Sequence, residues 1–352
     1  MSTAVAASVS VAVEEITSAE ALEAFAAEWA ELWERCPAAT PFQHPAWLVP
    51  WWNCFGAQPG WALWTLAARA HGRLTAVAPL FIHPGPDPSV RQVSPVGIAN
   101  TDYLGPLLDP ADDGSATAAL LAHLAAHAER WDVCDLEEIR EGDPLLSAPM
   151  PDGLRAEASP QSLCPVLALA KNAEEFFAAR SSWLRRNLRR GERRLSEQAP
   201  LAFETADGDT LDEFVDAFFR LHEERWAAEG QDGLLQGELM RRFHRESSER
   251  LMDAGLLRLH GMRFDGRLAA IFHGLGGHGR VHAYLGGFEP GLGRDNPGTL
   301  IAGYAMEQAM AEGAREFDFL RGQEKYKYDW GAADQRTHRI RILHADSPER
   351  AW

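Results

Sequence analysis

Apolar residues along this chain change their spacing several times, and each spacing predicts a different element. In four stretches they recur every three to four residues, which is the period of an amphipathic helix. These stretches are 18–36, about 115–130, 210–230 and about 298–313. Around 63–81 and 257–275 the order is strand, tight turn, strand, with His71-Gly72 and Asp265-Gly266 at the turns, which predicts two β-hairpins.

The two predicted hairpins repeat one another. At an offset of 194 residues, six of their positions are identical. The pairs are Leu63/Leu257, Arg69/Arg263, Gly72/Gly266, Arg73/Arg267, Leu74/Leu268 and Ala76/Ala270. After each hairpin comes a Tyr-Leu-Gly stretch followed by an acidic residue and a proline, at 102–110 and 283–291. A helix and a short strand with a central Asp complete each half.

Both halves therefore have the order helix, β-hairpin, strand, helix, strand. This repetition predicts an internal duplication that gives two α/β domains in tandem. The Pro-rich stretch 143–165 is the predicted connection between them. We expect an N-terminal domain at 1–160 and a C-terminal domain at 161–352.

The charge of the chain limits its partners. A net charge of −17 repels the phosphates of nucleic acids and of anionic membranes, so we expect no binding to DNA. Any anion must then be held by a local basic cluster. The opening residues 1–15 have no basic segment and make a poor signal peptide, and no run of about 18 apolar residues exists, so no membrane insertion is predicted.

The cysteines and histidines give no metal-binding spacing. Four scattered cysteines include no CxxC pair and no Cys/His cluster. They are Cys36, Cys54, Cys134 and Cys164. We expect them to be reduced and mostly buried in a cytoplasmic protein, and we predict no metal site.

A Gly-rich loop precedes the last long helix. Five glycines lie between 286 and 298, and Asn296 and Pro297 are suited to the N-cap and the first helical position. Backbone N–H groups at a helix N-terminus, together with the helix dipole, favour a phosphate or pyrophosphate. A surface turn with an ordinary cap is the alternative.

A basic helix is predicted at 181–198. Six arginines recur there at positions i, i+1, i+4 and i+5, and they fill one half of the helix surface. They are Arg185, Arg186, Arg189, Arg190, Arg193 and Arg194. In a chain this acidic they indicate an anion-binding face, although a solvated helix face that answers nearby carboxylates explains them equally well.

Lysine is rare in this chain, and two of the three lysines lie in the stretch LRGQEKYKYDWG at 320–331. An ammonium is a compact point charge, unlike the flat fork of arginine, and it suits a developing oxyanion. The neighbouring Tyr326, Tyr328 and Trp330 would exclude water and strengthen the charge of Lys327. The alternative is a loop with packed aromatic rings and solvated lysines.

The sequence gives weaker support for a catalytic role of several other residues. Asp318 lies in a strand and is a candidate general base, with a structural carboxylate as the alternative. His273 and His282 are candidate bases of the kind that is more often structural. The pair Asp102 and Tyr103 in the first half has the same ambiguity. No Gly-x-Ser-x-Gly turn supports an acyl-enzyme mechanism.

Taken together, these stretches resemble a known family over about 40–345. The LRRNLRRGERRL helix, the run from GRLAAIFHG to YKYDWGA, and the earlier PFQHPAWLVPWWNCFG and TDYLGPLLDP look like the CelD/BioF2-like acetyltransferases. This family is a branch of the GCN5-related N-acetyltransferase (GNAT) superfamily with the tandem arrangement of the FemABX transferases. The resemblance implies two GNAT-like domains, each with a mixed sheet that splays between its fourth and fifth strands.

The resemblance also implies a donor site in the second domain. The pantetheine of an acyl-CoA would pair with the strand RVHAYLGGF, and the pyrophosphate would bind the loop 287–299. The loop reads Arg-Asp-Asn-Pro-Gly-Thr, one residue longer between Arg and Gly than the superfamily signature. The implied cofactor-binding residues are Gly286, Gly287, Arg294, Asn296, Gly298 and Thr299.

FemABX enzymes carry a Phe-Lys-x-x-Phe-Gly-like motif, to which YKYDWG is similar, and Lys327 takes the place of its charge-stabilising lysine. The expected catalytic residues are then Lys327, Asp318 and Tyr284. The expected substrate-binding residues are Arg186, Arg190, Tyr326, Tyr328, Asp102 and Tyr103. The function implied is N-acyl transfer from acetyl-CoA or another acyl-CoA to an amine, such as an amino sugar of exopolysaccharide or envelope synthesis.

Two further hypotheses remain. A FemABX-type enzyme would take its aminoacyl group from tRNA, which the basic helix favours and the acidic net charge opposes. A non-catalytic partner of a polysaccharide-synthesis complex would keep the fold without turnover.

Overall fold

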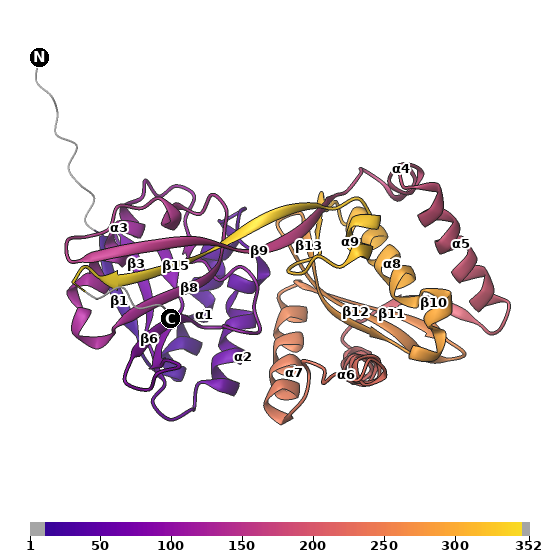
Figure 1. The fold of residues 1–352 in the computed structure, drawn as a ribbon, viewed down its shortest axis with the longest axis horizontal. Helices are drawn as coiled ribbons and strands as arrows, with labels where there is room; N and C mark the ends of the chain where they lie inside the picture. The colour runs from indigo at the N-terminus through magenta and orange to yellow at the C-terminus, as the bar shows by residue number, and fades with distance from the viewer. Residues whose placement is uncertain (1–10, 347–352) are drawn as a thin grey trace, which may run out of the picture. The chain divides into compact units, whose positions relative to one another are not determined.

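The computed structural model describes residues 11–346, and its elements form two compact units (Figure 1). One unit comprises the chain up to Ser162 together with the segment from Arg336 onward, and the other comprises Leu163–Gln335. Strands β9 (Leu154–Ala168) and β15 (Ala333–His344) each run from one unit into the other. The expected domains were 1–160 and 161–352; the units divide two residues later, and residues 336–346 group with the first unit rather than the second.

The second unit is built on a mixed sheet with strand order β10-β11-β12-β13-β14-β9. Its strands are β10 (Leu201–Thr205), β11 (Leu257–Phe264), β12 (Arg267–Gly277), β13 (Arg280–Phe288), β14 (Glu316–Asp318) and β9. Its helices are α4 (Ala173–Ala178), α5 (Ser182–Ser196), α6 (Leu211–Ala228), α7 (Glu238–Asp253), η4 (Pro290–Asp295), α8 (Pro297–Ala311) and α9 (Lys325–Asp329). All neighbouring strands are antiparallel except β13 and β14.

Two apolar cores cover the two faces of this sheet. Strand β12 alternates, so that Ile271 packs with Phe214 and Phe218 of α6, while Phe272 packs with residues of α8 on the other face. Leu184 and Leu195 anchor α5 to the α8 side. The two faces are therefore distinct environments, one under α6 and α7 and one under α5 and α8.

The first unit contains two sheets. One has the order β1-β3-β4-β7, and within this unit the other runs β9-β15-β8-β6-β5-β2. The strands not yet located are β1 (Val11–Ile16), β2 (Ala62–Leu63), β3 (Thr65–Ala70), β4 (Arg73–Ala78), β5 (Leu80–Pro84), β6 (Arg91–Pro95), β7 (Leu107–Leu108) and β8 (Val133–Arg140). The helices are α1 (Ala19–Glu34), η1 (Pro41–Gln43), α2 (Pro45–Phe55), α3 (Ser115–Ala126), η2 (Ala128–Arg130) and η3 (Pro144–Leu146).

The two predicted hairpins are present as β3–β4 and β11–β12, and they agree residue for residue. Arg69 pairs with Leu74 and Arg263 pairs with Leu268, and in both hairpins the register shifts just before the arginine. Both turns have positive φ at the two central residues, which is the reason that glycine occupies the second of them. The two hairpins that repeat in the sequence therefore also have the same strand register and the same turn geometry.

Ion pairs repeat along with the hairpins. Arg69 binds Glu14 of β1 and Glu28 of α1, and Arg263 binds Glu204 of β10 and Glu213 of α6. In each unit one arginine therefore ties an edge strand and a helix to the hairpin.

A second pair repeats at the acidic residue before proline. Arg73 binds Asp109 at 3.0 Å, and Arg267 binds Glu289 at 2.7 Å. The strand before this residue differs between the units, because β7 keeps only the last two pairings that β13 makes with its hairpin. The second unit follows the predicted order of helix, hairpin, strand, helix and strand. In the first unit β5 and β6 come between the hairpin and the two-residue β7, so the long penultimate strand forms only in the second.

Within residues 11–346, no helix is long and apolar enough to cross a membrane. The four cysteines are buried and unpaired with one another, as expected. Burial raises the pKa of Cys36 to about 11 and that of Cys134 further, which favours the neutral thiol over the thiolate at neutral pH.

Candidate functional site

The second unit opens where β13 and β14 part. The two strands run parallel and pair only through Arg280–His282 with Glu316–Asp318. Strand β13 continues for six more residues to Phe288, while the chain turns away after Asp318. This is the splayed pair that the family resemblance implied, and it leaves residues 283–288 without a β14 partner.

A β-bulge marks the same point of β13. His273 of β12 pairs with Leu285 and Gly274 pairs with Ala283, so Tyr284 has no residue opposite it. The ring of Tyr284 lies 5.6 Å from that of His244 and 5.9 Å from that of His273. The bulge therefore directs Tyr284 toward the face covered by α6 and α7.

Buried polar side chains gather on that face. His244 and Ser248 of α7 and His273 of β12 are fully enclosed, and the Ser248 hydroxyl lies 3.2 Å from Nε2 of His273. Burial lowers the pKa of His273 to about 4. Burial and the neighbouring His273 hold the pKa of His244 well below its usual range. Both imidazoles are neutral at pH 7, and such weak bases can orient an acceptor but abstract protons poorly.

The sequence identified only part of this group. His273 was considered as a single strand histidine, whereas the structure surrounds it with partners from α7. His244 and Ser248 were missed, because only their position on the inner face of an amphipathic helix distinguishes them from other polar helix residues.

Asp318 and His282 lie side by side at the end of the paired segment. Oδ2 of Asp318 is 4.0 Å from Nε2 of His282, and both residues are buried. Oδ1 of Asp318 accepts the backbone N–H of Leu320 at 2.8 Å, which supports the positive φ of that residue. Asp318 thus stabilises the turn and also lies next to the point where β13 and β14 part.

The ammonium of Lys327 closes the same turn. Lys327 is only 3% exposed, and its Nζ donates to the carbonyl oxygens of Leu320, Arg321 and Gly322 at 3.3, 2.7 and 3.0 Å. Glu324 adds an ion pair at 2.9 Å. A compact cation with three rotatable donors fits this cradle, and a planar guanidinium does not. The need for lysine therefore has a structural reason, and in this arrangement the ammonium points into the turn.

The aromatic neighbours of Lys327 occupy three different environments. Trp330 is buried against Phe176 and Phe177. Tyr328 donates to Asp334 at 2.7 Å, and Tyr326 is 47% exposed with Phe319 edge-on to it. Carbonyl groups rather than these rings surround the ammonium, so the expected aromatic wall is not what shields it.

The Gly-rich loop is partly helical. It forms η4, and Asn296, at φ 55°, is the N-cap of α8 with Pro297 at the first helical position, as predicted. Arg294 is exposed, and Gly298 and Thr299 lie in the first turn of the helix. The loop therefore delivers a helix N-terminus directly after the splayed strand.

Gly286 and Gly287 have a packing role as well. A Cβ on Gly287 would overlap backbone atoms of Leu221 and His222 in α6, and the Gly286 carbonyl lies 3.3 Å from Nδ1 of His222. Gly287 therefore lets α6 approach the sheet closely, whereas a Cβ on Gly286 would overlap the carbonyl oxygen of Ile271 in β12.

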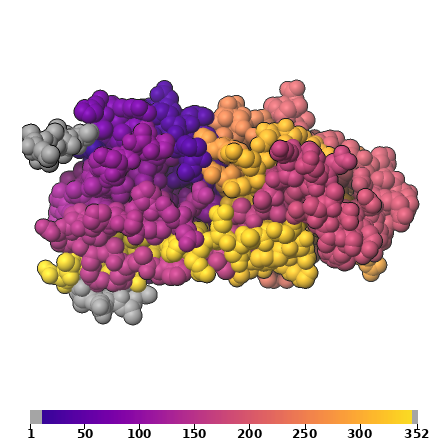
Figure 2. All heavy atoms as spheres, turned by 90° about the horizontal axis from the view of Figure 1, so that it is seen from above, coloured from indigo at the N-terminus to yellow at the C-terminus, as the bar shows by residue number. Residues whose placement is uncertain are grey.

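The basic helix α5 is attached to this loop. Gly191 packs directly on the backbone of Asp295, where a Cβ would overlap the carbonyl oxygen, and Arg194 lies 3.1 Å from the Asp295 carboxylate. The structure thus brings together two regions that the sequence identified separately. The face formed by α4 and α5 (crimson) lies at the surface in Figure 2.

The arginines of α5 divide between two flanks. Arg186 and Arg190 are exposed, and Arg190 lies on the flank of Arg194, with Asn187 at 3.4 Å. Arg185 and Arg189 lie on the other flank, where they line a cavity of about 580 Å³ with residues of α4 and α8. The first flank adjoins the loop before α8 through Arg194.

Asp102 and Tyr103 lie in the first unit. Both are buried, and the ring of Tyr103 packs below Arg140 with 5.3 Å between the guanidinium carbon and the ring centroid. The structure therefore places these two expected substrate-binding residues in a core.

Comparisons with known proteins agree with this geometry. Residues 182–328 match the family described as acetyltransferase (GNAT) domain. No curated protein matches the chain. A crystal structure of FemX is similar with a TM-score of 0.67 and 13% identity, over 94% of this chain and 96% of that one. The C-terminal domain of a putative lysylphosphatidylglycerol synthetase from Agrobacterium fabrum has a TM-score of 0.57 and 12% identity, over 91% and 92%.

The likeness to FemX confirms the predicted mixed α/β fold with two GNAT-like units. The match of residues 182–328 to the acetyltransferase (GNAT) domain confirms the predicted class of enzyme, a GNAT-type N-acyltransferase. The match to the acetyltransferase domain falls within the second unit, which contains the splay, the bulge and the loop before α8.

Proposed function

We propose that this protein transfers an acyl group from an acyl-CoA to an amine acceptor in the second unit. The observation that carries the proposal is the parting of β13 from β14 after three residue pairs, directly followed by η4 and the N-terminus of α8. The open edge of β13 can pair with an extended chain that contains amide groups, and the helix N-terminus that follows it can bind phosphates. Together they suit a ligand with both parts.

The donor would lie along residues 283–288 of β13. Amide groups of the pantetheine arm would pair with this strand, and the pyrophosphate would bind at Gly298 and Thr299 in the first turn of α8. Arg190 and Arg186 on the flank of α5 would add positive charge in a chain whose net charge is −17. Gly287 acts by letting α6 pack under this strand, Gly286 lets β13 lie close to β12, and Arg294 and Asn296 shape the loop.

The chemical step would be direct transfer. The acceptor nitrogen attacks the thioester carbonyl, backbone N–H groups of β13 near the Tyr284 bulge stabilise the oxyanion, and collapse breaks the C–S bond. The proton of the amine passes, directly or through water, to Asp318 and His282 and from there to the departing thiolate, so that CoA leaves as the thiol. We assign Lys327 a positioning role: it holds the turn that bears Asp318 and so keeps the splay open.

The acceptor would approach on the face of α6 and α7 through the partly buried Tyr284, whose ring the enclosed His244 and His273 hold in place from behind. An amino sugar of exopolysaccharide or envelope synthesis is the proposed acceptor class, and it rests on the CelD/BioF2-like resemblance. Tyr326, which is half exposed, and Tyr328 are further candidates for acceptor contacts.

Aminoacyl transfer from tRNA is the second candidate. The exposed arginines of α5 favour it, because RNA binding needs a basic surface, and the FemX-like fold is compatible with it. Loss of turnover after ribonuclease treatment, with acyl-CoA present, would select this candidate over the first.

The test is calorimetric titration of acetyl-CoA and free CoA into the full-length protein, Arg190→Glu and Arg189→Glu. We expect micromolar binding by the wild type, weakening of at least about tenfold in Arg190→Glu, and a much smaller effect in Arg189→Glu, which has the same charge change on the opposite flank. No binding of either compound by the wild type would reject the acyl-CoA proposal. Equal effects of the two variants would reject the assigned phosphate position.

A further inference from the structure

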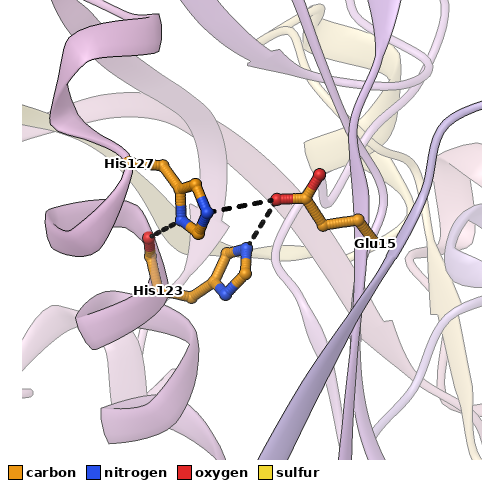
Figure 3. Close-up of side chains that lie close together, drawn as sticks. All are labelled: Glu15, His123 and His127. Carbon is orange, nitrogen blue, oxygen red and sulfur yellow. Dashed lines mark hydrogen bonds and ion pairs between the residues drawn. The ribbon is translucent and has the colours of Figure 1, made fainter.

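The first unit contains a compact group of two histidines and one glutamate. His123 and His127 project from the end of α3 toward Glu15 of β1 (Figure 3). Nε2 of His123 lies 2.8 Å from Oε1 of Glu15, and Nε2 of His127 lies 3.8 Å from the same oxygen. All three side chains are partly buried. The spacing of His123 and His127 is visible in the sequence and was passed over, whereas Glu15 could not be assigned to them because 108 residues separate it from His123.

We propose that Glu15, His123 and His127 form a binding site for a divalent transition-metal ion of the Zn²⁺ class. Two histidines four residues apart face the same side of a helix, and with a carboxylate they supply an N₂O donor set that suits this class. Around an ion with bonds of about 2.1 Å, neighbouring donor atoms lie about 3.0–3.4 Å apart. The observed separations of 2.8 and 3.8 Å bracket that range, so small side-chain rotations complete the site.

The surroundings already orient the ligands. Nδ1 of His127 lies 2.9 Å from the backbone carbonyl oxygen of His123, so this nitrogen donates and Nε2 is the acceptor that faces Glu15 (Figure 3). Metal binding requires the lone pair on Nε2 of His123, so the proton that Nε2 now shares with Glu15 is lost while Nδ1 carries the remaining proton of the neutral ring.

Arg130 determines the strength of the site. Its Nη1 lies 2.9 Å from each oxygen of Glu15, and its guanidinium stacks on Trp64 at 4.5 Å from the ring centroid. With the ion on Oε1, Arg130 would stay paired with Oε2. Its positive charge repels the ion, so removing that charge should strengthen binding.

The site joins β1 to α3 and would act as a structural clamp in the first unit. Glu15 pairs through its backbone with Leu66 of β3, so the ion would also fix the edge of the four-stranded sheet. This role is independent of the acyl-transfer proposal, which concerns the second unit.

The test is titration of chelator-treated full-length protein with Zn²⁺ by calorimetry, repeated with Co²⁺ by absorption spectroscopy. We expect one ion per chain and a tetrahedral or five-coordinate Co²⁺ spectrum. His127→Ala and Glu15→Gln should each weaken binding at least about tenfold. Arg130→Gln should tighten it, and His71→Asn, which changes an exposed histidine in a hairpin turn, should leave it unchanged.

His127 is the safest variant for folding, since its side chain is 34% exposed. Circular dichroism would establish that each variant is folded before titration. Absence of one-to-one binding by the wild type would overturn the proposal. So would binding that His127→Ala leaves unchanged, or an Arg130→Gln variant that is folded and binds more weakly than the wild type.

Discussion

Asp318 and Lys327 stabilise the same turn through opposite backbone groups. The carboxylate accepts a hydrogen bond from the N–H of Leu320, and the ammonium donates to the carbonyl oxygens of residues 320–322. Because this turn carries the chain away from β13, the two charged side chains determine where the sheet opens. Two residues that the sequence suggested for catalysis thus lie at the same turn, and both stabilise it.

Replacing Lys327 should therefore harm the fold and the activity together. Lys327→Met keeps the length of the side chain but leaves three carbonyl groups without their donor, and we expect a loss of about 3 kcal/mol in the free energy of unfolding. Lys327→Arg should not restore stability, because a planar fork cannot reach all three oxygens. Urea unfolding and acyl-transfer rates on the same samples would measure both effects.

Lys325→Met is the matched control for that experiment. Lys325 is 84% exposed and pairs with Asp329 on the helix surface, so its loss should change stability by about 0.5 kcal/mol or less. If Lys327→Met kept its stability and lost only turnover, the ammonium would have to contact the reacting atoms, and the positioning role would be wrong.

A second prediction concerns the docking of α5 on the loop before α8. Gly191→Ala places a Cβ against the Asp295 carbonyl, so the helix must move and carry Arg190 with it. We expect weaker CoA binding, by about tenfold, in titration calorimetry.

Gly303→Ala is the control for this change, since it also adds one methyl group to a helical glycine. The new Cβ would lie 3.5 Å from Trp330, an ordinary contact, and the variant should bind CoA like the wild type. Equal binding by the wild type and Gly191→Ala would show that the position of α5 does not matter for the donor.

Some features of the fold and of the candidate site could be predicted from the sequence, and others could not. The hairpins, their turns and the duplication were predictable, because apolar alternation and Gly at a positive φ leave a local signal. The proximity of Gly191 and Asp295 was not, since two glycine-containing segments a hundred residues apart carry no mark of contact. Lys327 was identified because lysine is rare in this chain. Whether its ammonium faces a ligand or the backbone could not be predicted, because its partners are three backbone carbonyl groups, and every residue has such a group.

The buried histidines of the second unit should make its stability depend on pH. The folded pKa of His273, about 4, is below its unfolded value near 6.5, so the contribution of His273 is complete above pH 6.5 and is lost as the pH falls toward 4. The shift corresponds to a loss of the order of 3 kcal/mol, and His260, lowered to about 3 by burial, adds to it. His273→Gln removes one titrating group, and urea midpoints measured from pH 7 to 4 should then fall less steeply. An unchanged slope would mean that His273 is already solvated in the native state.

The repeated ion pairs give a prediction that compares the two units directly. Arg263→Met leaves Glu204 and Glu213 facing one another, and Arg69→Met does the same to Glu14 and Glu28. Since these carboxylates are partly exposed, each substitution should cost about 1–2 kcal/mol rather than the larger amount typical of a buried pair.

Hydrogen exchange measured by mass spectrometry would locate these two effects. We expect faster exchange in β10 and β11 for Arg263→Met and in β1 and β3 for Arg69→Met, because each arginine ties its own edge strand to its own helix. Adding Glu213→Gln to Arg263→Met should recover part of the protection, since it removes one of the two facing charges. If Arg69→Met increased exchange in β10 and β11 as much as in β1 and β3, the two arginine clusters would not act independently. The prediction that each arginine stabilises only its own unit would then be wrong.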